Sequence, residues 1–411
     1  MYPPDGCPLN PDDRGLVTAI IPGQEGIYRH LRARVAQLLA DSGLISDTSE
    51  KISDLGLAKS SAKYYDEDTV LIAMYGATVG QLAILKAPAT VNQAVCALCV
   101  DPEIADYRYV FYVLMATRHD LTIQAAGAAQ QNLNQGLIRD FEIPIYPLNK
   151  QRRIANVLGS LDDLIENNRR RIEILEEMAR LIYREWFVHF RFPGHEDVEL
   201  VDSDLGPIPE GWDLGVIGDL GDVVTGSTPP TKEASLYGGL APFLTPSDMT
   251  GERFVETARS LSEQGIERFE RRMVPPGSVC FTCIGSIGKL AVAADLLLTN
   301  QQINSVVPLS PYSSGFIYQL LRDRSEYVLS IASGAATPIV NKSTFKAVEV
   351  LLPHPDVLAS FDRVECTMGG LVHVLTHQNR VLGKARDLLL PRLISGELDV
   401  SDLDLDLEPV A

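Results

Sequence analysis

The stretch SVCFTCIGSIGKLAVA (Ser278–Ala293) is an apolar run interrupted by two glycines, with a lysine directly behind the second. A similar phrase, TVLIAMYGATVGQLAIL, occupies Thr69–Leu85, and its Gly80 aligns with Gly288 at an offset of 208 residues. Short β-branched apolar runs that end at glycine-containing turns are typical of strands. The chain is therefore predicted to contain the same strand–turn–strand unit twice.

The repeat continues beyond these two phrases. At the same offset TVNQAV (Thr90–Val95) aligns with LTNQQIN (Leu298–Asn304), and after a one-residue slip GAAQQNLN (Gly127–Asn134) aligns with GAATPIVN (Gly334–Asn341). A long helical pattern follows each copy, and similarity at a fixed period indicates repeated structural units. We expect a mixed α/β (α+β) fold in which two β-rich globules alternate with two long helices.

The long helices carry a coiled-coil pattern. Seam residues follow spacings of four and three, with one asparagine in each seam, which favours pairing in a single register. At about 1.5 Å per residue each helix would span roughly 50 Å. The alternative is two amphipathic helices that each pack only on their own globule. The predicted seam consists of Ile154, Leu158, Leu161, Ile165, Asn168, Ile172 and Leu175 in the first helix and of Met368, Val372, Leu375, Asn379 and Leu382 in the second.

Length and composition indicate a folded protein with more than one domain. A chain of 411 residues is too long for one ordinary core, and 45% hydrophobic and 22% charged residues are typical of globular proteins. No apolar run approaches the roughly 18 residues of a membrane-spanning helix, and the N-terminal sequence lacks a signal-peptide pattern. Six cysteines in this length do not make a disulfide scaffold. We therefore expect a cytoplasmic protein with no membrane partner.

The formal net charge of −18 argues against a protein that coats nucleic acid without sequence preference, because neutralising phosphates requires lysine and arginine. A sequence reader needs only a few local basic groups, so the total charge leaves that class open. Part of the excess lies in GELDVSDLDLDLEPVA (Gly396–Ala411), which carries six acids and no base. We expect residues 397–411 to form a solvated acidic tail or an assembly contact.

The motifs that suggest metal or phosphate chemistry are weak. CALC (Cys96–Cys99) and CFTC (Cys280–Cys283) have the spacing of zinc half-sites, but the repeat aligns Cys280 with Ile72, and residues three apart on a strand face opposite sides. HVLTH (His373–His377) lacks the glutamate of a metalloprotease helix, and GSIGKL has too short a glycine spacing for a phosphate loop. We expect core cysteines, no metal site, no catalytic residues and no cofactor in this chain, and hence a binding protein.

The chain resembles the specificity subunit of type I restriction-modification enzymes. The resemblance rests on PIPEGWDLGVIGDLGDVVTGSTPP (207–230), PFLTPSDM, PPGSVCFTCIGSIGKLAV and TNQQIN in the second globule. It rests equally on IYPLNKQRRIANVLGSLDDLIENNRRRIEILEEMARLIYREWF after the first globule and on LGKARDLLLPRLISGEL near the end. It implies a first target recognition domain at 1–148, a spacer helix at 149–192, a second target recognition domain at 205–355, a second spacer helix at 356–396 and the tail at 397–411.

In that family each target recognition domain reads one half of a split DNA site, while the long helices pair antiparallel as a spacer and dock the modification subunits. The resemblance therefore implies a DNA sequence-recognition subunit that directs adenine methylation and restriction by its partners. The implied partners are double-stranded DNA, methyltransferase (modification) subunits and motor-nuclease (restriction) subunits, with S-adenosylmethionine, ATP and Mg bound by the partner subunits. The alternatives are the same architecture in another defence system or in a methylation-only complex, and a scaffold or glycan-binding protein with paired β-rich modules.

Polar residues in the repeated loops are the candidate DNA contacts. Most protein–DNA contacts go to phosphate and a few polar side chains read base edges, so cations, hydroxyls and amides beside the glycine turns are the residue types expected. Any one of them is alternatively an ordinary solvated surface residue. The candidates are Lys59, Lys63, Thr78, Gln81, Gln130 and Asn134 in the first copy and Ser227, Thr228, Lys232, Arg253, Ser286, Lys289 and Lys342 in the second.

Residues 1–47 break the repeat. At offset 208 they should echo the segment that begins at Pro209, but they contain no Gly-Trp opening and no Gly-Ser-Thr-Pro loop. IYRHLRARVAQLLADSG (Ile27–Gly43) has a helical pattern where the other copy has loop and strand. Either the first domain is divergent there, or the reading frame is shifted or starts in the wrong place. We favour the second interpretation, which implies a damaged first reader.

Overall fold

The computed structural model describes residues 43–46, 52–60, 62–125, 132–204, 206–334 and 336–400. The chain forms two compact units, one from Met1–Asn167 with Asn379–Ala411 and the other from Asn168–Gln378. Each unit combines one β-rich globule with one part of each long helix. Within the described ranges, no helix is both long enough and apolar enough to cross a membrane.

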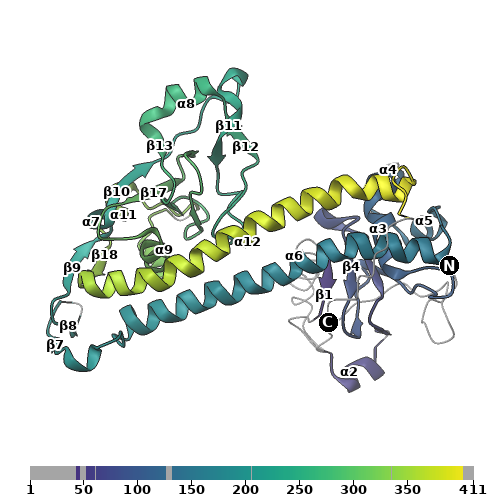
Figure 1. Ribbon diagram of the computed structural model, residues 1–411, viewed down its shortest axis with the longest axis horizontal. Coiled ribbons are helices and arrows are strands. Elements are labelled where there is room, and N and C mark those ends of the chain that lie inside the picture. Colours follow the sequence, from purple (N-terminus) through teal and green to yellow (C-terminus); the bar gives the residue numbers. More distant parts are fainter. Residues whose placement is uncertain are drawn as a thin grey trace. The chain divides into compact units, whose positions relative to one another are not determined.

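The second globule is built around a four-stranded antiparallel sheet with the order β10-β17-β14-β15. Its strands are β10 (Gly221–Thr225), β17 (Ile303–Pro308), β14 (Val279–Thr282) and β15 (Leu290–Val292), and Figure 1 shows β10 beside β17. Strand β14, the first half of the repeated phrase, is buried along its whole length. Its alternate residues belong to two different hydrophobic clusters, so both faces of the strand are covered.

A second sheet of this globule has the order β12-β11-β16-β13, in which only the β11/β16 pair is parallel. Its strands are β12 (Arg259–Leu261), β11 (Tyr237–Leu244), β16 (Leu297–Thr299) and β13 (Met273–Val274). Two short antiparallel pairs complete the strands of this unit. They are β9 (Asp213–Val216) with β18 (Glu349–Leu352) and β7 (Leu200–Val201) with β8 (Ile208–Pro209).

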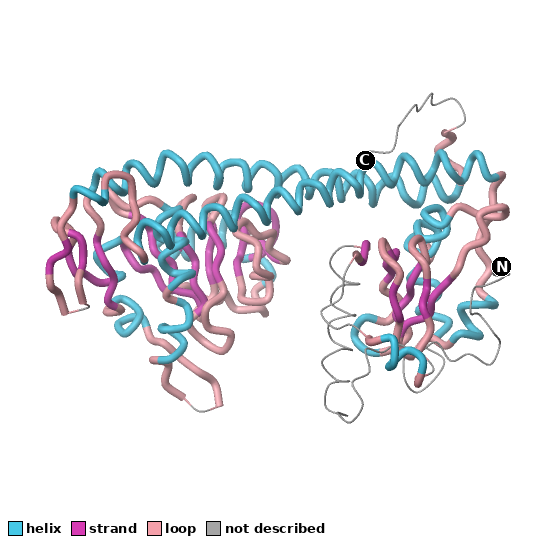
Figure 2. The backbone as a smooth tube through the Cα atoms, turned by 90° about the horizontal axis from the view of Figure 1, so that it is seen from below, coloured by secondary structure: helices cyan, strands magenta, loops and turns pink. Residues whose placement is uncertain are grey.

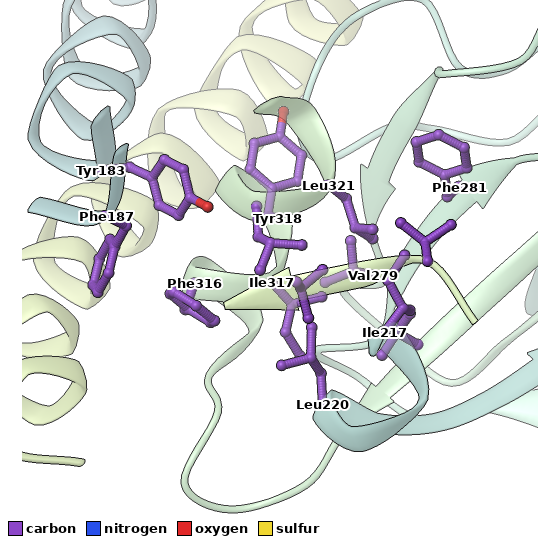
Figure 3. Close-up of a cluster of buried hydrophobic side chains, with 14 of the residues drawn as sticks. Tyr183, Phe187, Ile217, Leu220, Val279, Phe281, Phe316, Ile317, Tyr318 and Leu321 are labelled. Carbon is purple, nitrogen blue, oxygen red and sulfur yellow. The ribbon is translucent and has the colours of Figure 1, made fainter. Parts of the chain in front are cut away.

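Helix α9 (Ser314–Asp323) connects the sheet to the long helices of the second unit. Figure 3 shows Phe316 on the side of Tyr183 and Phe187, whereas Ile317 lies toward Val279 of β14. The ring centres of Phe187 and Phe316 are 5.1 Å apart, and such aromatic contacts add to the free energy gained by burying the rings. The other helical segments are α7 (Ile217–Leu220), η3 (His195–Asp197), η4 (Ala234–Leu236), α8 (Glu263–Phe269), η5 (Glu270–Arg272), α10 (Ser325–Ser330) and α11 (Lys342–Lys346).

The first globule has a sheet with the order β1-β4-β3-β6. Its strands are β1 (Leu44–Ile45), β4 (Leu82–Leu85), β3 (Val70–Ala73) and β6 (Val95–Leu98), and β1 pairs in parallel with β4. Of residues 1–47 only 43–46 are described, so the interpretation of that segment as a shifted frame stays a prediction. The remaining elements are α2 (Asp54–Ala58), β2 (Tyr64–Tyr65), η1 (Gly76–Thr78), β5 (Ala89–Thr90), α3 (Tyr107–Ala116), α4 (Arg118–Ala125) and α5 (Gln135–Asp140).

The strand registers show the same three-strand arrangement in both globules and correct the alignment of the repeat by one residue. Leu71 pairs with Ala83 and Ala97, whereas Cys280 pairs with Ala291 and Ser305. Cys280 therefore occupies the place of Leu71 and not that of Ile72, as the sequence alignment had it. The physical reason is that the glycine turn before β15 is one residue shorter than the turn before β4.

The long helices are α6 (Leu148–Tyr183), which continues into the π-helical turn η2 (Arg184–Val188), and α12 (Pro355–Ser395). The helical backbone ends at Val188, short of the predicted 192, because Phe190 has a left-handed conformation with φ 57°. Within each unit the two helices lie alongside each other (Figure 2). In the first unit Arg386 of α12 donates to Asp162 of α6 at 2.7 Å. In the second, Asn168 donates to Gln378 at 3.5 Å.

The predicted seam residues are all buried or half-buried, and Asn168 is 1% exposed. Ile154 and Leu158 also belong to the core of the first globule, together with Leu393. Val372 belongs to the core of the second globule. The helices thus pair with each other and pack on the globules at the same time, so the alternative of two separate helices is wrong.

The beginning of the predicted acidic tail is only partly solvated. Val400 is fully buried in the core of the first globule, and Leu398 packs against the same cluster. The prediction of a solvated tail is wrong for Leu398 and Val400 because these apolar residues pack on the hydrophobic core. Glu397 and Asp399 are exposed, and the Glu397 carboxylate accepts from Arg392 at 3.0 Å. Residues 401–411 lie outside the described residues.

Candidate nucleic-acid interface

The loops that carry most of the second copy's predicted contacts leave the second globule at one end of its main sheet. Thr225, the last residue of β10, pairs with Asn304 of β17, and Thr282, the last residue of β14, pairs with Ile303. The end of β10, the end of β14 and the beginning of β17 therefore lie side by side. We call the segments that meet here, residues 226–232, 245–246, 283–289 and 300–302, the loop end of the second globule.

Backbone hydrogen bonds join these segments. Ser227 N–H donates to Thr299 O at 2.8 Å, Asn300 N–H donates to Leu244 O at 2.9 Å, and Cys283 N–H donates to Gln302 O at 2.7 Å. A set of loops that is fixed by main-chain hydrogen bonds presents its side chains in one arrangement, which lowers the entropy lost on binding.

The proline-rich loop 226–232 carries three of the predicted contacts. Ser227 is half-buried, whereas Thr228 and Lys232 are exposed. The Thr228 hydroxyl donates to Oε1 of Gln301. The Tyr237 hydroxyl donates to Pro229 O at 2.7 Å and so fixes the middle of the loop. The structure therefore brings Ser227, Thr228 and Lys232 together on one loop, which side-chain hydrogen bonds from Thr228 and Tyr237 hold in place.

The glycine turn 283–289 holds two more predicted contacts, Ser286 and Lys289, both exposed. Gly285 and Gly288 have φ values of 74° and 98°, a backbone region that favours glycine. Lys289 Nζ donates to Pro246 O at 2.8 Å, which places its ammonium group over the neighbouring loop.

Lys342 lies near the loop end because the segment before it, GAATPIVN, is hydrogen-bonded to the glycine turn. Val340 N–H donates to Cys283 O at 2.9 Å, and Gly285 N–H donates to Pro338 O at 3.0 Å. Asn341 caps α11, which begins at the exposed Lys342. The GAATPIVN segment therefore lies beside the glycine turn, and Lys342 follows directly after it.

Arg253 is a correction to the predicted interface. Its side chain is 4% exposed, and its Nη1 donates to Oε1 of Glu365 at 2.6 Å. Glu176 of α6 lies 3.9 Å away, and the ring centre of Tyr318 lies 4.8 Å from the guanidinium carbon. An arginine buried against two helix carboxylates is not available to a phosphate, so Arg253 anchors the second globule on its helices and is not a DNA contact.

Burial also changes the pKa of Glu176, the third residue of this contact. Glu176 lies in the contact between α6 and the globule, and burial raises the pKa of its carboxyl group above 4.5, although the nearby Arg253 and Arg322 act in the opposite direction. Gly369 of α12 leaves room for the guanidinium group, because a Cβ atom there would lie 2.9 Å from Nη1 of Arg253. The Arg253 guanidinium group therefore fits closely between the two long helices and pairs there with the carboxylates of Glu176 and Glu365.

The first globule has an equivalent arrangement. Ala73, the last residue of β3, pairs with Val95, the first residue of β6, so the glycine turn and the 91–94 turn lie at the same end. Gln81 Oε1 accepts from Arg118 at 3.0 Å, and Thr78 is half-buried in η1. These two predicted contacts therefore lie where Lys289 and the 283–289 turn lie in the other copy.

The other predicted contacts of the first copy differ in environment. Asn134 caps α5 by accepting from Leu137 N–H at 2.9 Å, as Asn341 caps α11, so its side-chain oxygen has a structural role. Lys63 is half-buried and directly precedes β2, and Lys59 is exposed at the end of α2. Gln130 lies outside the described residues.

The sequence reasoning did not select Gln93, Gln301 and Arg272. Gln93 and Gln301 are exposed at the same position of the same turn in the two copies. Arg272 is exposed and donates to Thr225 O at 2.9 Å, which places it beside the loop end. The shared Asn-Gln pair of the repeat was a signal that could have found the two glutamines, whereas nothing in the sequence indicated Arg272.

The cysteines predicted as core residues are mostly that. Cys96, Cys280 and Cys283 are buried free thiols, and Cys280 and Cys283 belong to two different clusters. Cys99 is half-buried and disulfide-bonded. The ring of the exposed His373 lies tilted against Phe254, with ring centres 4.6 Å apart. Among the residues that the structure describes, no three His, Cys, Asp or Glu side chains are grouped as metal ligands would be.

Comparisons with known proteins agree with this duplicated architecture. The family model described as "Type I restriction modification DNA specificity domain" matches twice, over residues 38–177 and 209–357. The two matches together cover more than half of the chain, and each includes one glycine turn with its Asn-Gln turn.

Characterised relatives match over most of their length. The type I restriction enzyme HindI specificity subunit of Haemophilus influenzae is 27% identical over 307 residues, which are 60% of this chain and 67% of the relative. The type I restriction enzyme MjaIX specificity subunit of Methanocaldococcus jannaschii is 26% identical over 364 residues, which are 87% of this chain and 84% of the relative.

A solved structure supports the fold. The S subunit of a type I restriction-modification system from M. genitalium superposes with a TM-score of 0.53 and 16% sequence identity, covering 86% of this chain and 88% of that chain. At this identity the similarity concerns the fold alone, and the family follows from the two matches to the family model. The chain belongs to the type I restriction-modification DNA specificity family and carries two copies of its domain.

Proposed function

We propose that this chain reads a DNA site made of two different words separated by a fixed gap, with one globule for each word. The observation that supports this most strongly is the duplicated pair of turns: in both globules a glycine turn and an Asn-Gln turn extend from three equivalent strands, and the two copies carry different side chains there. Lys289 in the second copy takes the place of Gln81 in the first. Two scaffolds of one kind with different polar side chains suit two different DNA words.

The chain supplies recognition and partner subunits supply the chemistry. We propose that methyltransferase subunits transfer methyl groups to adenine from bound S-adenosylmethionine, and that motor-nuclease subunits use ATP and Mg. The names of the relatives, which are restriction-enzyme specificity subunits, support this division of labour. The site of action would be the cytoplasm, where the DNA of a prokaryotic cell lies.

The long helices of the second unit offer a docking surface for the methyltransferase subunit. Ile174, Met178 and Leu181 of α6 are 58%, 47% and 48% exposed, and Leu371 and Val374 of α12 are 41% and 51% exposed. Apolar side chains at helical spacing on the outer face of a helix pair favour a partner that covers them. The family to which the chain belongs supports the methyltransferase subunit as that partner.

Methylation mapping of the reconstituted complex tests the proposal. The chain is combined with the methyltransferase subunit of its own system and S-adenosylmethionine, and modified adenines are located across a genome. We expect one motif with two specified words and a constant gap. Methylation that follows no motif, or no salt-sensitive DNA binding by the complex, would contradict the proposal and would favour a scaffold.

Exchange of the second globule provides the control. If residues 209–357 are replaced by the equivalent domain of a relative, one word should change while the other word stays the same. A change in both words would mean that the globules do not read independently.

A further inference from the structure

The Asn-Gln turns have the same construction in both globules. Asn92 and Asn300 are 6% and 8% exposed, and their side-chain oxygens accept from Ala94 N–H at 2.8 Å and from Gln302 N–H at 3.0 Å. In each turn the asparagine shapes the backbone and the next residue, a glutamine, is exposed. The turn therefore presents one amide side chain to solvent in each copy.

The two glutamines also hold the same position relative to the sheets. Met74 N–H donates to Ala94 O at 2.7 Å in the first copy, and Cys283 N–H donates to Gln302 O at 2.7 Å in the second. These bonds tie each Asn-Gln turn to the neighbouring glycine turn. Gln93 and Gln301 therefore occupy equivalent positions, each one residue before the residue whose carbonyl accepts this hydrogen bond.

The side chains around the glutamines differ between the copies. Gln81 bonds to Arg118 in the first globule, whereas Lys289 reaches Pro246 O in the second. A side chain that is kept in the same place while its neighbours diverge suits a contact that does not depend on the word being read. DNA phosphates provide such a contact, because they are the same in every sequence.

We propose that Gln93 and Gln301 each donate a hydrogen bond from the side-chain amide to a phosphate oxygen at equivalent places of the two half-sites, and that the residues beside them choose the bases. This inference rests on the proposed function. The Thr228 hydroxyl donates to Oε1 of Gln301, so one lone pair of this oxygen is engaged within the protein, while the NH₂ group has two hydrogens to donate. Reading of adenine by glutamine would need both the oxygen and the nitrogen.

The experiment measures DNA affinity of the reconstituted complex with Gln301→Ala, Gln93→Ala and the control Glu349→Ala. Glu349 is exposed on β18, opposite Val216 of β9, in a two-stranded sheet separate from the main sheet that carries the loop end. Each glutamine variant should weaken binding at least about tenfold, and equally for every single-base change in the half-site, because one hydrogen bond to a charged acceptor is lost. The control should leave affinity unchanged.

Single methylphosphonate substitutions in the duplex locate the contact. One position in each half-site should weaken the wild-type complex but leave the corresponding glutamine variant unaffected, since the variant has already lost that bond. Gln301→Glu, which keeps the size of the side chain, should bind more weakly than Gln301→Ala because its carboxylate repels the phosphate.

Relaxed preference at one base pair in Gln301→Ala would overturn the inference and would make Gln301 a base reader. Unchanged affinity in both glutamine variants would overturn it as well. Failure of the wild-type complex to prefer any sequence would refute the proposed function itself, so the two failures are distinguishable. Thermal melting of each variant, compared with Glu349→Ala, shows whether the fold is intact.

Discussion

At the scale of single residues, the second globule depends on the charged anchor formed by Arg253, Glu365 and Glu176. Arg253 and Glu365 are almost fully buried and 2.6 Å apart, so the attraction between them offsets part of the cost of removing both charges from water. The glycines beside them leave the space that these side chains fill. Such a contact fixes how a globule sits on its own helices more firmly than surface ion pairs do.

Replacing Arg253 by methionine should destabilise the second unit by about 3–5 kcal/mol, because the Glu365 carboxylate is left buried without a partner. Both tryptophans, Trp186 and Trp212, lie in this unit and report its unfolding in urea by fluorescence. The control is Arg191→Ala, which breaks an exposed pair with Glu185 and should cost below about 1 kcal/mol. Equal losses of unfolding free energy in the two variants would show that the buried contact of Arg253 stabilises the unit no more than an exposed ion pair does.

Glu176 should make the stability of the second unit depend on pH. Its pKa is raised in the folded chain, so the folded state binds the proton more tightly than the unfolded state. The stabilisation from this group is complete below its ordinary value of 4.5 and is lost as the pH rises through the raised pKa. Glu176→Gln cannot titrate there. The wild-type protein should therefore lose unfolding free energy relative to Glu176→Gln as the pH rises from about 4.5 to neutrality. A pH-independent difference would contradict this account.

At the scale of elements, Asp162 joins three helices of the first unit. Its carboxylate accepts from Arg386 of α12 at 2.7 Å and from the Tyr112 hydroxyl of α3, also at 2.7 Å. Burial raises the pKa of the Tyr112 hydroxyl, with the Asp162 carboxylate as the next cause. A single side chain of α6 thus holds both its partner helix and the helix that covers the sheet.

Asp162→Ala should destabilise the first unit by about 2–3 kcal/mol, because two partly buried donors lose a charged acceptor. The neighbouring Asp163 provides a matched control, since its carboxylate pairs with Arg108 at 3.1 Å and its side chain is 33% exposed. Asp163→Ala should cost about 1 kcal/mol or less. Protection of amide hydrogens in α3 from exchange would show the difference. Equal protection in both variants would show that Asp162 does not hold α3 and α12 to α6.

At the scale of the whole molecule, the paired helices are proposed to set the gap between the two words. Adding one heptad to each helix, beside Asn168 and beside Gln378, keeps the seam in phase and adds about 10 Å of helix. That length corresponds to about 3 bp of DNA. Because 3 bp also rotate the groove by roughly a third of a turn, the lengthened protein should lose its original site and bind a re-spaced site less tightly. Methylation mapping is the measurement, and an unchanged gap would rule out the helices as the ruler.

The sequence by itself determined the features that local patterns encode. The fixed offset between Gly80 and Gly288 predicted two copies of one sheet, and the four-three spacing predicted helices that pair through Asn168. These predictions succeed because strands, turns and helix seams depend on neighbours a few residues away. The loop residues Thr228, Ser286 and Lys289 were chosen as candidate contacts from the same kind of local pattern, since they adjoin glycine turns, and their role as DNA contacts stays a prediction.

Only the tertiary structure decided which polar groups are available at the surface. Arg253 follows a loop and looked like a free cation, but residues more than 70 positions away, Glu176 and Glu365, bury it. Val400 is hidden among acids in the sequence and lies in a core in the structure. The proposal for Gln301 rests on the turn that Asn300 builds and on the bond from Thr228, which lies on a different loop. Burial and pairing depend on contacts between distant parts of the chain, and no local pattern of residues contains that information.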